Sequence, residues 1–393
     1  MIPFEEAFRT IMDSARKLET EEVPIEQAYN RILAKDVTSD MDMPPFDKSA
    51  MDGYACRRED LGNELAVLEE IPAGYVPRRT ISRNECAKIM TGGMVPEGAD
   101  CVIMVEHTKK ITDSTIVFTG KETKGNIRPK AHHVKKGSVV LARGAKLTVP
   151  RIAVAASYGC AIPLVSRRPK VGIIATGNEL VEPHEKPPFS KIRNSNGYQI
   201  CAHVASAGAV PTYYGIARDT EQSLDGMIKT VKAANDVIIM SGGVSMGDYD
   251  LVPGLLEKNG FRLLFERVEI KPGRPTVFGV SDEAFCFGLP GNPVSTFVTF
   301  ELLVKPFLYK LMGHTFRPPF MPMLLDHDLT RKKADRTAWI PVVFTDNGGV
   351  AAIEYHGSDH IHSLSKADGM ICIPMGITEI KKGTTVHVRS IQS

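Results

Sequence analysis

The sequence has few cysteines and none of the pairs that mark a disulfide-rich or zinc-binding domain. Its 393 residues include seven cysteines, and no two of them form a Cys-x-x-Cys pair. An odd, scattered set argues against a disulfide framework and against a structural zinc knuckle, and it suits a reducing compartment. We therefore expect free thiols in a cytoplasmic protein.

Long apolar runs and an excess of one charge are also missing. A membrane helix needs roughly 20 uninterrupted apolar residues, and the nearest stretch, residues 153–165, is broken by Ser157 and Gly159. The first residues lack the basic and apolar regions of a signal peptide. The 48 Lys and Arg against 46 Asp and Glu leave no basic excess for binding nucleic acid. We expect neither a membrane nor a nucleic acid as a partner.

The hydrophobic pattern changes along the chain and predicts a multidomain protein with α/β and β parts. Residues 46–137 alternate short β-like runs with Gly and Pro turns, which predicts a β-rich module. Over 170–312, buried strands alternate with helices, which indicates a doubly wound α/β domain. An N-terminal helix and a discontinuous extended domain are expected over 1–45 and 138–169, and a β-like domain over 313–393. Helices are predicted near residues 25–33, 197–207, 221–233 and 295–310.

Three loops follow predicted parallel strands of the α/β domain and carry unusual residues. In an open α/β sheet, ligands bind beyond the carboxyl ends of the strands. Glycines there let backbone N–H groups approach a phosphate, and a helix N-terminus supplies the positive end of a dipole. We therefore expect an anion site. The loops are TGNE at 176–179, SGGVSMGDYD at 241–250 and GLPGNP at 288–293.

A fourth loop, KPGRP at 271–275, holds two cations on a proline-fixed frame. Such a pair suits an oxyanion such as phosphate, sulfate or molybdate. Glu179, Asp219 and Asp250 are expected close by, and carboxylates beside a phosphate site suggest Mg²⁺ or hydrogen bonds to an amino-rich heterocycle. Each loop alone could equally be a solvated turn, whereas four at one sheet edge favour a ligand site.

Six segments of the sequence share a pattern with one known family. They are FDKSAMDGYA at 46–55, KIMTGGMVPEGAD at 88–100, TGNEL at 176–180, SGGVSMG at 241–247, KPGRP at 271–275 and LPGNPVS at 289–295. With them the chain resembles the molybdopterin molybdenumtransferase (MoeA) family, which is related to the C-terminal domain of gephyrin. The resemblance covers nearly the whole chain and is weakest toward its C-terminus.

The resemblance implies a transferase of molybdenum cofactor biosynthesis. Such an enzyme inserts molybdate into adenylylated molybdopterin and releases AMP, with Mg²⁺ required. The dithiolene belongs to the substrate, so no protein cysteine need act as a nucleophile. The implied fold has a MogA-like α/β domain that binds molybdopterin, an all-β module, a discontinuous extended segment and a C-terminal β-barrel. The resemblance also implies a homodimer that shares its active site between subunits, with the molybdopterin adenylyltransferase as a candidate partner.

Site residues follow from the resemblance position by position. Lys271 and Arg274 would neutralise molybdate, and Ser363 would donate a hydrogen bond to it. The implied catalytic residues are Asp52, Thr91, Glu179, Asp219 and Asp250, with Asp219 and Asp250 at the metal and with Asp52 and Thr91 reaching the cleft from the partner subunit. The implied substrate-binding residues are Gly242, Gly243, Ser245, Lys271, Arg274, Pro275, Pro290, Asn292, Arg336 and Ser363. One departure is His133, which stands where many members have an aspartate.

Three alternatives stay open. The adenylyltransferase step uses the same α/β fold, although the flanking β parts argue for the insertion step. Tungstate could replace molybdate as the inserted oxyanion. A non-catalytic scaffold that binds the pterin is the third, and the intact acids and cations of the loops argue against it.

Overall fold

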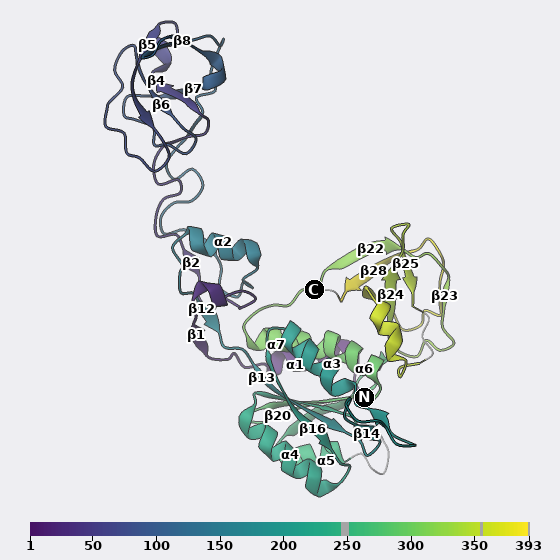
Figure 1. Ribbon diagram of the computed structural model, residues 1–393. Helices are drawn as coiled ribbons and strands as arrows, with labels where there is room; N and C mark the ends of the chain where they lie inside the picture. The colour runs from purple at the N-terminus through teal and green to yellow at the C-terminus, as the bar shows by residue number, and fades with distance from the viewer. Residues whose placement is uncertain (245–250, 354–356, 392–393) are drawn as a thin grey trace.

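The molecule is elongated, with a β module at one end and an α/β domain beside a β-barrel at the other (Figure 1). The computed structural model describes residues 1–244, 251–353 and 357–391. The predicted fold class, a multidomain combination of α/β and β parts, is confirmed. No helix in these described ranges is long and apolar enough to cross a membrane.

A six-stranded sheet forms the centre of the α/β domain. Its strands are β13 (Lys170–Thr176), β16 (Val210–Ala217), β17 (Val237–Ser241), β18 (Arg262–Arg267), β20 (Pro275–Val280) and β21 (Phe285–Leu289). Their order is β16-β13-β17-β21-β20-β18. The first four are parallel, while β20 is antiparallel to both of its neighbours. The central strands are buried almost throughout, as expected for a parallel sheet with both faces covered.

Helices cover both faces of this sheet (Figure 1). They are α1 (Phe4–Ser14), α3 (Asn196–Ser206), α4 (Glu221–Ala234), α5 (Val252–Lys258), α6 (Pro293–Thr299) and α7 (Lys305–Leu311). Helices α1, α3, α6 and α7 share one apolar cluster with Ile173, and α4 and α5 share another with Ile174. Because successive residues of a strand point to opposite faces, β13 contributes to two separate cores.

Two predicted helices differ from the structure. The helix predicted near 25–33 is wrong: only Ile25–Gln27 form a 3-10 turn, and Ile32 and Leu33 make β-bridges instead. Asn30 takes a positive φ of 61°, which a continuing helix does not allow. The helix predicted over 295–310 is helical, but a π segment, η4 (Phe300–Val304), separates α6 from α7.

The chain runs out to the β module and returns beside itself. Two short strand pairs line this arm, β1 (Thr20–Glu22) with β12 (Leu164–Ser166) and β2 (Val37–Thr38) with β11 (Val139–Leu141). Helix α2 (Val149–Ser157) packs alongside the arm (Figure 1). Closer to the module, Met43 bridges Val134 and β3 (Lys48–Ser49) pairs with β10 (Ile127–Arg128). The module is therefore joined to the rest by two adjacent segments.

The module is a mixed six-stranded sheet of order β7-β4-β6-β5-β9-β8. Its strands are β4 (Gly53–Cys56), β5 (Glu64–Ile71), β6 (Glu85–Ile89), β7 (Cys101–Met104), β8 (Thr108–Thr112) and β9 (Thr115–Phe118). Apolar side chains from the two faces form two small clusters. The β-rich pattern of this segment thus gives the expected sheet.

The C-terminal strands curve into a barrel. They are β22 (Phe320–Leu324), β24 (Thr337–Phe344), β25 (Val350–Ala352), β26 (Gly369–Ile373) and β28 (Thr385–Ser390), with the pair β23 (Leu329–Thr330) and β27 (Glu379–Ile380). Strand β19 (Ile270–Lys271), from the α/β domain, joins their sheet. The sheet order is β19-β24-β26-β28-β22, and β25 pairs with β24. A bridge between Leu325 and Val350 joins the end of β22 to β25 and closes the ring.

Candidate active site

A cavity of about 860 Å³ lies between the carboxyl edge of the α/β sheet and the barrel. The α/β domain contributes the loops at 271–275 and 290–292, and the barrel contributes residues from 329 to 358. Its charged lining consists of Lys271, Arg274, Arg331 and Arg336, and no acid stands among the described residues that line it. Positive charges that line a cavity attract anions.

The loop at 271–275 is held by both domains. Strand β19 leaves the α/β domain and pairs in parallel with the start of β24, next to Arg336. The Arg336 Nη1 donates a 3.4 Å hydrogen bond to the carbonyl of Ile270. Arg274 precedes β20, whose antiparallel pairing with β21 brings its first residue, Pro275, to the carboxyl edge. Lys271 and Arg274 therefore enter the cavity on a frame shared by sheet and barrel.

Gly273 allows this loop to pack closely. Its φ is +113°, and a Cβ added there would lie 2.5 Å from Thr299 Oγ1 on α6. A side chain at this position would meet both backbone strain and a steric clash. The glycine thus keeps Lys271 and Arg274 close to the sheet edge.

The loops after β13, β17 and β21 lie so close together that their backbones are in contact. The Gly242 N–H donates a 3.1 Å hydrogen bond to Leu289 O, and a Cβ on Gly242 would lie 2.5 Å from Thr176 O. Gly242 and Gly243 both have positive φ. Pro290 and Asn292 line the cavity, and the Asn292 side chain donates to Ser358 Oγ of the barrel at 2.6 Å. Three of the loops expected at this edge therefore meet there.

Two of the predicted acids, Asp219 and Glu179, lie at the same sheet edge but outside the cavity lining. Asp219 Oδ2 accepts a 2.9 Å hydrogen bond from the Asn178 N–H, and the Asp219 N–H donates to Asn178 Oδ1 at 3.3 Å. The Glu179 carboxylate lies against Gly177, where a Cβ would be 2.5 Å from it. Ser245 and Asp250 lie outside the described residues. Asp219 and Glu179 are thus placed beside the loop that follows β13.

The barrel contributes one cation that the sequence did not single out. The Arg331 guanidinium donates to the carbonyls of Ile377, Pro374 and Arg336 at 2.5, 2.6 and 2.9 Å. It therefore fixes the backbone of Arg336 as well as lining the cavity. Ser363 is buried outside the lining, and its hydroxyl donates to His360 O at 2.7 Å. Its role toward molybdate stays a prediction.

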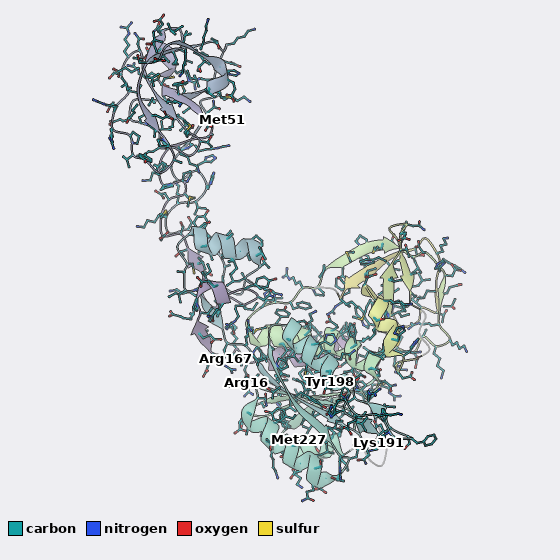
Figure 2. All side chains as sticks on the ribbon, in the orientation of Figure 1. Arg16, Met51, Arg167, Lys191, Tyr198 and Met227 are labelled. Carbon is teal, nitrogen blue, oxygen red and sulfur yellow. The ribbon has the colours of Figure 1, made fainter. Side chains whose placement is uncertain are left out.

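Asp52 and Thr91 form a local pair in the β module. Asp52 Oδ1 accepts from the Thr91 hydroxyl at 2.7 Å and from the Thr91 N–H at 2.6 Å. These bonds hold the pKa of Asp52 below its usual value of 3.8. Met51, the preceding residue, lies at the opposite end of the molecule from Tyr198 of α3 (Figure 2). His133 lies on the arm, where its N–H donates to Met43 O and its ring packs near His132.

Comparison with known sequences agrees with this architecture along the chain. Residues 2–159 match the MoeA N-terminal region (domain I and II), 172–310 a probable molybdopterin binding domain, and 327–391 the MoeA C-terminal region (domain IV). A Bacillus subtilis molybdopterin molybdenumtransferase is 34% identical over 405 residues, covering 100% of this chain and 94% of the relative. The chain belongs to the molybdopterin molybdenumtransferase family. Its members are enzymes, and the family acts in molybdenum cofactor biosynthesis.

Other relatives and solved structures agree. The molybdopterin molybdenumtransferase of Nostoc sp. is 34% identical over 389 residues, covering 94% of this chain and 88% of the relative. Two crystal structures of the molybdopterin biosynthesis MoeA protein from Pyrococcus horikoshii superpose with TM-scores of 0.84 and 0.87, at 30% and 32% identity. The aligned regions span 100% and 99% of this chain, and they span 100% of each Pyrococcus horikoshii chain. The similarity therefore extends over all parts of this molybdenumtransferase family member.

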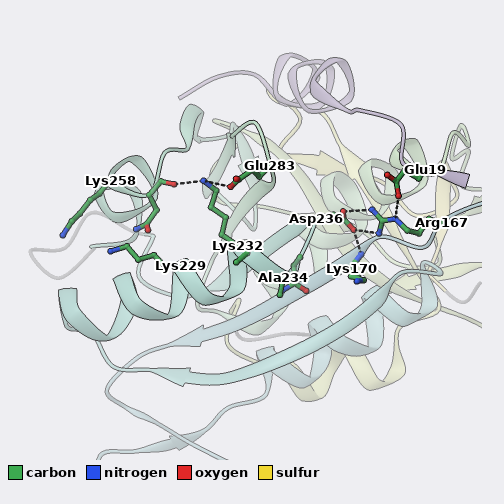
Figure 3. Close-up of a pocket in the computed structure, with 12 residues that line it drawn as sticks. Glu19, Arg167, Lys170, Lys229, Lys232, Ala234, Asp236, Lys258 and Glu283 are labelled. Carbon is green, nitrogen blue, oxygen red and sulfur yellow. Dashed lines mark hydrogen bonds and ion pairs between the residues drawn. The ribbon is translucent and has the colours of Figure 1, made fainter.

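A second cavity, of about 920 Å³, lies at the opposite, amino edge of the sheet (Figure 3). Its lining is also basic, but four of its five cations have carboxylate partners. Arg167 makes two hydrogen bonds with Asp236 at 2.8 and 2.9 Å, and Lys232 lies 3.4 Å from Glu283. Lys232 and Lys258 also stand in the last turns of α4 and α5, where cations offset the negative ends of helix dipoles. Structural roles account for the basic side chains of this cavity.

Proposed function

We propose that this enzyme inserts molybdate into adenylylated molybdopterin in the cavity between the sheet edge and the barrel, with release of AMP. The proposal rests on one observation: four cations line this cavity, and none of its described lining residues is an acid. Molybdate is a dianion, and ammonium and guanidinium groups bind oxyanions through charge-assisted hydrogen bonds. Pterin and phosphates would extend along the neighbouring glycine loop, whose backbone N–H groups suit an anion.

The proposed reaction joins a hydrolysis to a ligand exchange. Water attacks the phosphoanhydride, the P–O bond of the adenylyl group breaks, and AMP and the pterin phosphate separate. On molybdate, the two dithiolene sulfurs replace oxygen ligands, which leave with protons as water. Lys271 and Arg274 would hold the oxyanion and neutralise its charge, and the glycine loop would orient the phosphates. The cavity walls would limit access of bulk water to the new metal–sulfur bonds.

Mg²⁺ forms part of this proposal, with Asp219 and Asp250 as its ligands. Asp250 lies outside the described residues, and Asp219 presents a carboxylate at the sheet edge. The described ranges contain no group of three His, Cys, Asp or Glu residues that could hold a metal alone. Oxygen donors of this kind fit Mg²⁺, which proteins often hold through one or two carboxylates together with substrate phosphates. The ion would neutralise charge on the phosphates as the anhydride breaks.

A homodimer with shared active sites is also part of the proposal. Within one chain the β module, which carries Asp52 and Thr91, lies at the far end from the sheet edge (Figure 1). The Asp52–Thr91 pair would reach a cavity only on a second copy of the chain. We place the enzyme in the cytoplasm, where the molybdopterin adenylyltransferase would supply its substrate.

The test is AMP release from adenylylated molybdopterin with Mg²⁺, in the presence of molybdate, of tungstate or of neither. We expect release that depends on molybdate. Release with tungstate alone would mean that the enzyme inserts tungstate instead of molybdate by the same mechanism. A folded protein that binds the pterin but releases no AMP under any condition would contradict the enzyme reaction and support a scaffold.

A further inference from the structure

Asn196 joins two loops at the carboxyl edge of the sheet. It is the first residue of α3, and only 8% of its surface is exposed. Its Nδ2 donates to Gly291 O, in the loop after β21, at 2.6 Å. The same nitrogen donates to Ser241 Oγ, at the end of β17, at 2.8 Å. One side-chain amide thus connects the glycine loop at 241–243 to the loop at 290–292.

The donors and acceptors around Asn196 can be assigned from chemistry. A carbonyl oxygen only accepts, so the amide nitrogen must face Gly291 O. Ser241 Oγ then accepts the second N–H, and its own proton must point away from Asn196. The Asn196 Oδ1 is buried without a hydrogen-bond partner among the described residues. Unpaired buried polar atoms are rare in folded proteins, because they cost stability, and they need a specific explanation.

The Asn196 bonds hold the glycine loop and the loop at 290–292, but they do not reach the cation loop at 271–275. A Cβ built on Gly291 would lie 3.8 Å from the Gly242 Cα, so the two loops approach closely where Asn196 ties them together. The loop at 271–275 is held separately, by β24 and by the packing of Gly273 on Thr299. Loss of the Asn196 bonds should therefore loosen the glycine loop and leave the cations of the molybdate pocket in place.

We propose that Asn196 is a positioning residue that holds these two loops in the arrangement that binds the pterin nucleotide. It acts through Gly291 and Ser241, without contacting the ligand itself. The inference rests on the proposed function, because the affected ligand is adenylylated molybdopterin.

The chain offers a matched control at the other end of the same strand. Asn235 is 7% exposed and caps the C-terminus of α4, two residues before β17 begins at the amino edge. Its Nδ2 also donates two hydrogen bonds, to Tyr214 Oη at 2.9 Å and to Val231 O at 2.8 Å. The two asparagines thus have the same burial and the same kinds of acceptor, a hydroxyl and a carbonyl. They differ in their distance from the loops of the site.

The experiment compares Asn196→Ala with Asn235→Ala in steady-state AMP release. For Asn196→Ala we expect the KM for adenylylated molybdopterin to rise on the order of ten-fold, as for the loss of one or two hydrogen bonds. The molybdate concentration for half-maximal rate should change less than about two-fold. Asn235→Ala should change neither quantity. An unchanged pterin KM in folded Asn196→Ala, or an equal rise in Asn235→Ala, would overturn the proposal.

Two further variants separate hydrogen bonding from volume. Asn196→Asp keeps the size of the side chain but removes both donors and sets a carboxylate against Gly291 O, so its KM should rise at least as much as that of Asn196→Ala. Ser241→Ala removes one acceptor and leaves the bond to Gly291, so its shift should be smaller and in the same direction. A wild-type KM in Asn196→Asp would show that donation is not the cause.

Hydrogen exchange tests the inference without any substrate. Peptides that cover 285–293 should exchange faster in Asn196→Ala than in wild type, while peptides that cover 271–276 should not change. Equal exchange at 285–293 would overturn the connection between the loops. Wild-type protein that releases no AMP would instead contradict the proposed function, and the exchange result would still stand on its own.

Discussion

The two edges of the α/β sheet each carry a basic cavity, but their charges are arranged differently. At the amino edge four of the five lining cations have partners: Arg167 with Asp236, Lys229 with Asp225, Lys232 with Glu283 and Lys258 with Glu221. At the carboxyl edge Arg336 lies 3.5 Å from Asp335, but Lys271 and Arg274, close together in one loop, have no ion pair among the described residues. The cavity at the amino edge is the larger of the two, but it is therefore less suited to bind an anion. Unpaired charge, more than volume, distinguishes the ligand site from the structural one.

This difference has an energetic meaning. At the amino edge the partly buried pair of Arg167 and Asp236 stabilises the fold, because the positive charge is already neutralised. Unpaired cations placed side by side repel one another and lower the stability of the fold. The repulsion is relieved only when an anion binds between them. Substitutions at the two edges should thus divide into those that change ligand binding and those that change stability.

The largest effect is expected at the carboxyl edge. Lys271→Ala should raise the molybdate concentration for half-maximal AMP release by roughly 10- to 100-fold, because a charge-assisted hydrogen bond contributes about 1.5–3 kcal/mol. Lys271→Arg, which keeps the charge, should lose less. Titration of AMP release with molybdate measures both. A molybdate requirement unchanged in Lys271→Ala would contradict the assignment of the cation pair.

At the amino edge, Asp236→Asn should change stability and leave the molybdate requirement as it is. The Asp236 carboxylate accepts from the Arg167 guanidinium and from the Lys170 N–H at 2.7 Å. Loss of its charge should cost about 1–3 kcal/mol of folding free energy, because both groups are partly buried. Thermal melting and molybdate titration together check this. A changed molybdate requirement with an unchanged melting temperature would contradict this assignment, because it would place anion binding at the amino edge.

The same pair predicts a dependence on pH. Burial opposes ionisation of Asp236, but the hydrogen bonds from Arg167 and Lys170 outweigh it and hold its pKa below 3.8. A carboxyl whose pKa is lowered by folding stabilises the protein above its unfolded pKa, and this stability is lost as pH falls through the folded pKa. The melting difference between wild type and Asp236→Asn should therefore be full at neutral pH and shrink below about pH 4. A difference that grows in acid would contradict the ion pair as its source.

The smallest effect is expected for Lys258→Ala, also at the amino edge. Lys258 and Glu221 pair at 2.8 Å, but their side chains are 53% and 66% exposed. Exposed ion pairs contribute little because water and salt screen them. Neither the melting temperature nor the molybdate requirement should change measurably. A raised molybdate requirement in this variant would show that the amino edge takes part in anion binding.

The sequence predicts the α/β sheet well because the burial of a strand on both faces directly determines the apolar pattern of its residues. Strands such as β13 and β17 are covered on both faces, so their sequences are continuous apolar runs that end at a glycine loop. The rule for ligand binding at carboxyl ends then brings Gly242, Pro290 and Asn292 to one place. The segment 25–33 has no such simple pattern, because Ile32 and Leu33 are buried against strands and bridges distant in the sequence.

Parts of the site were not predictable from local sequence. Arg331 acts through three carbonyls that meet only when the barrel closes, so nothing next to it in the sequence marks it. Asn196 stands in the run Asn194-Ser-Asn196, which could equally be a helix cap. Its role depends on Ser241 and Gly291, 45 and 95 residues away. The roles of Asp52, Glu179 and Ser363 stay predictions from the resemblance.

The paired segments that lead to the β module also affect how the molecule unfolds. Because two adjacent segments join the module to the remainder, and the module has apolar clusters of its own, unfolding of the module need not disturb the α/β core. Cooperativity across such a connection is weak, so heating should give more than one transition. A melting temperature then belongs to one part of the chain, and substitutions at Asp236 should move the transition of the α/β domain while that of the module stays in place.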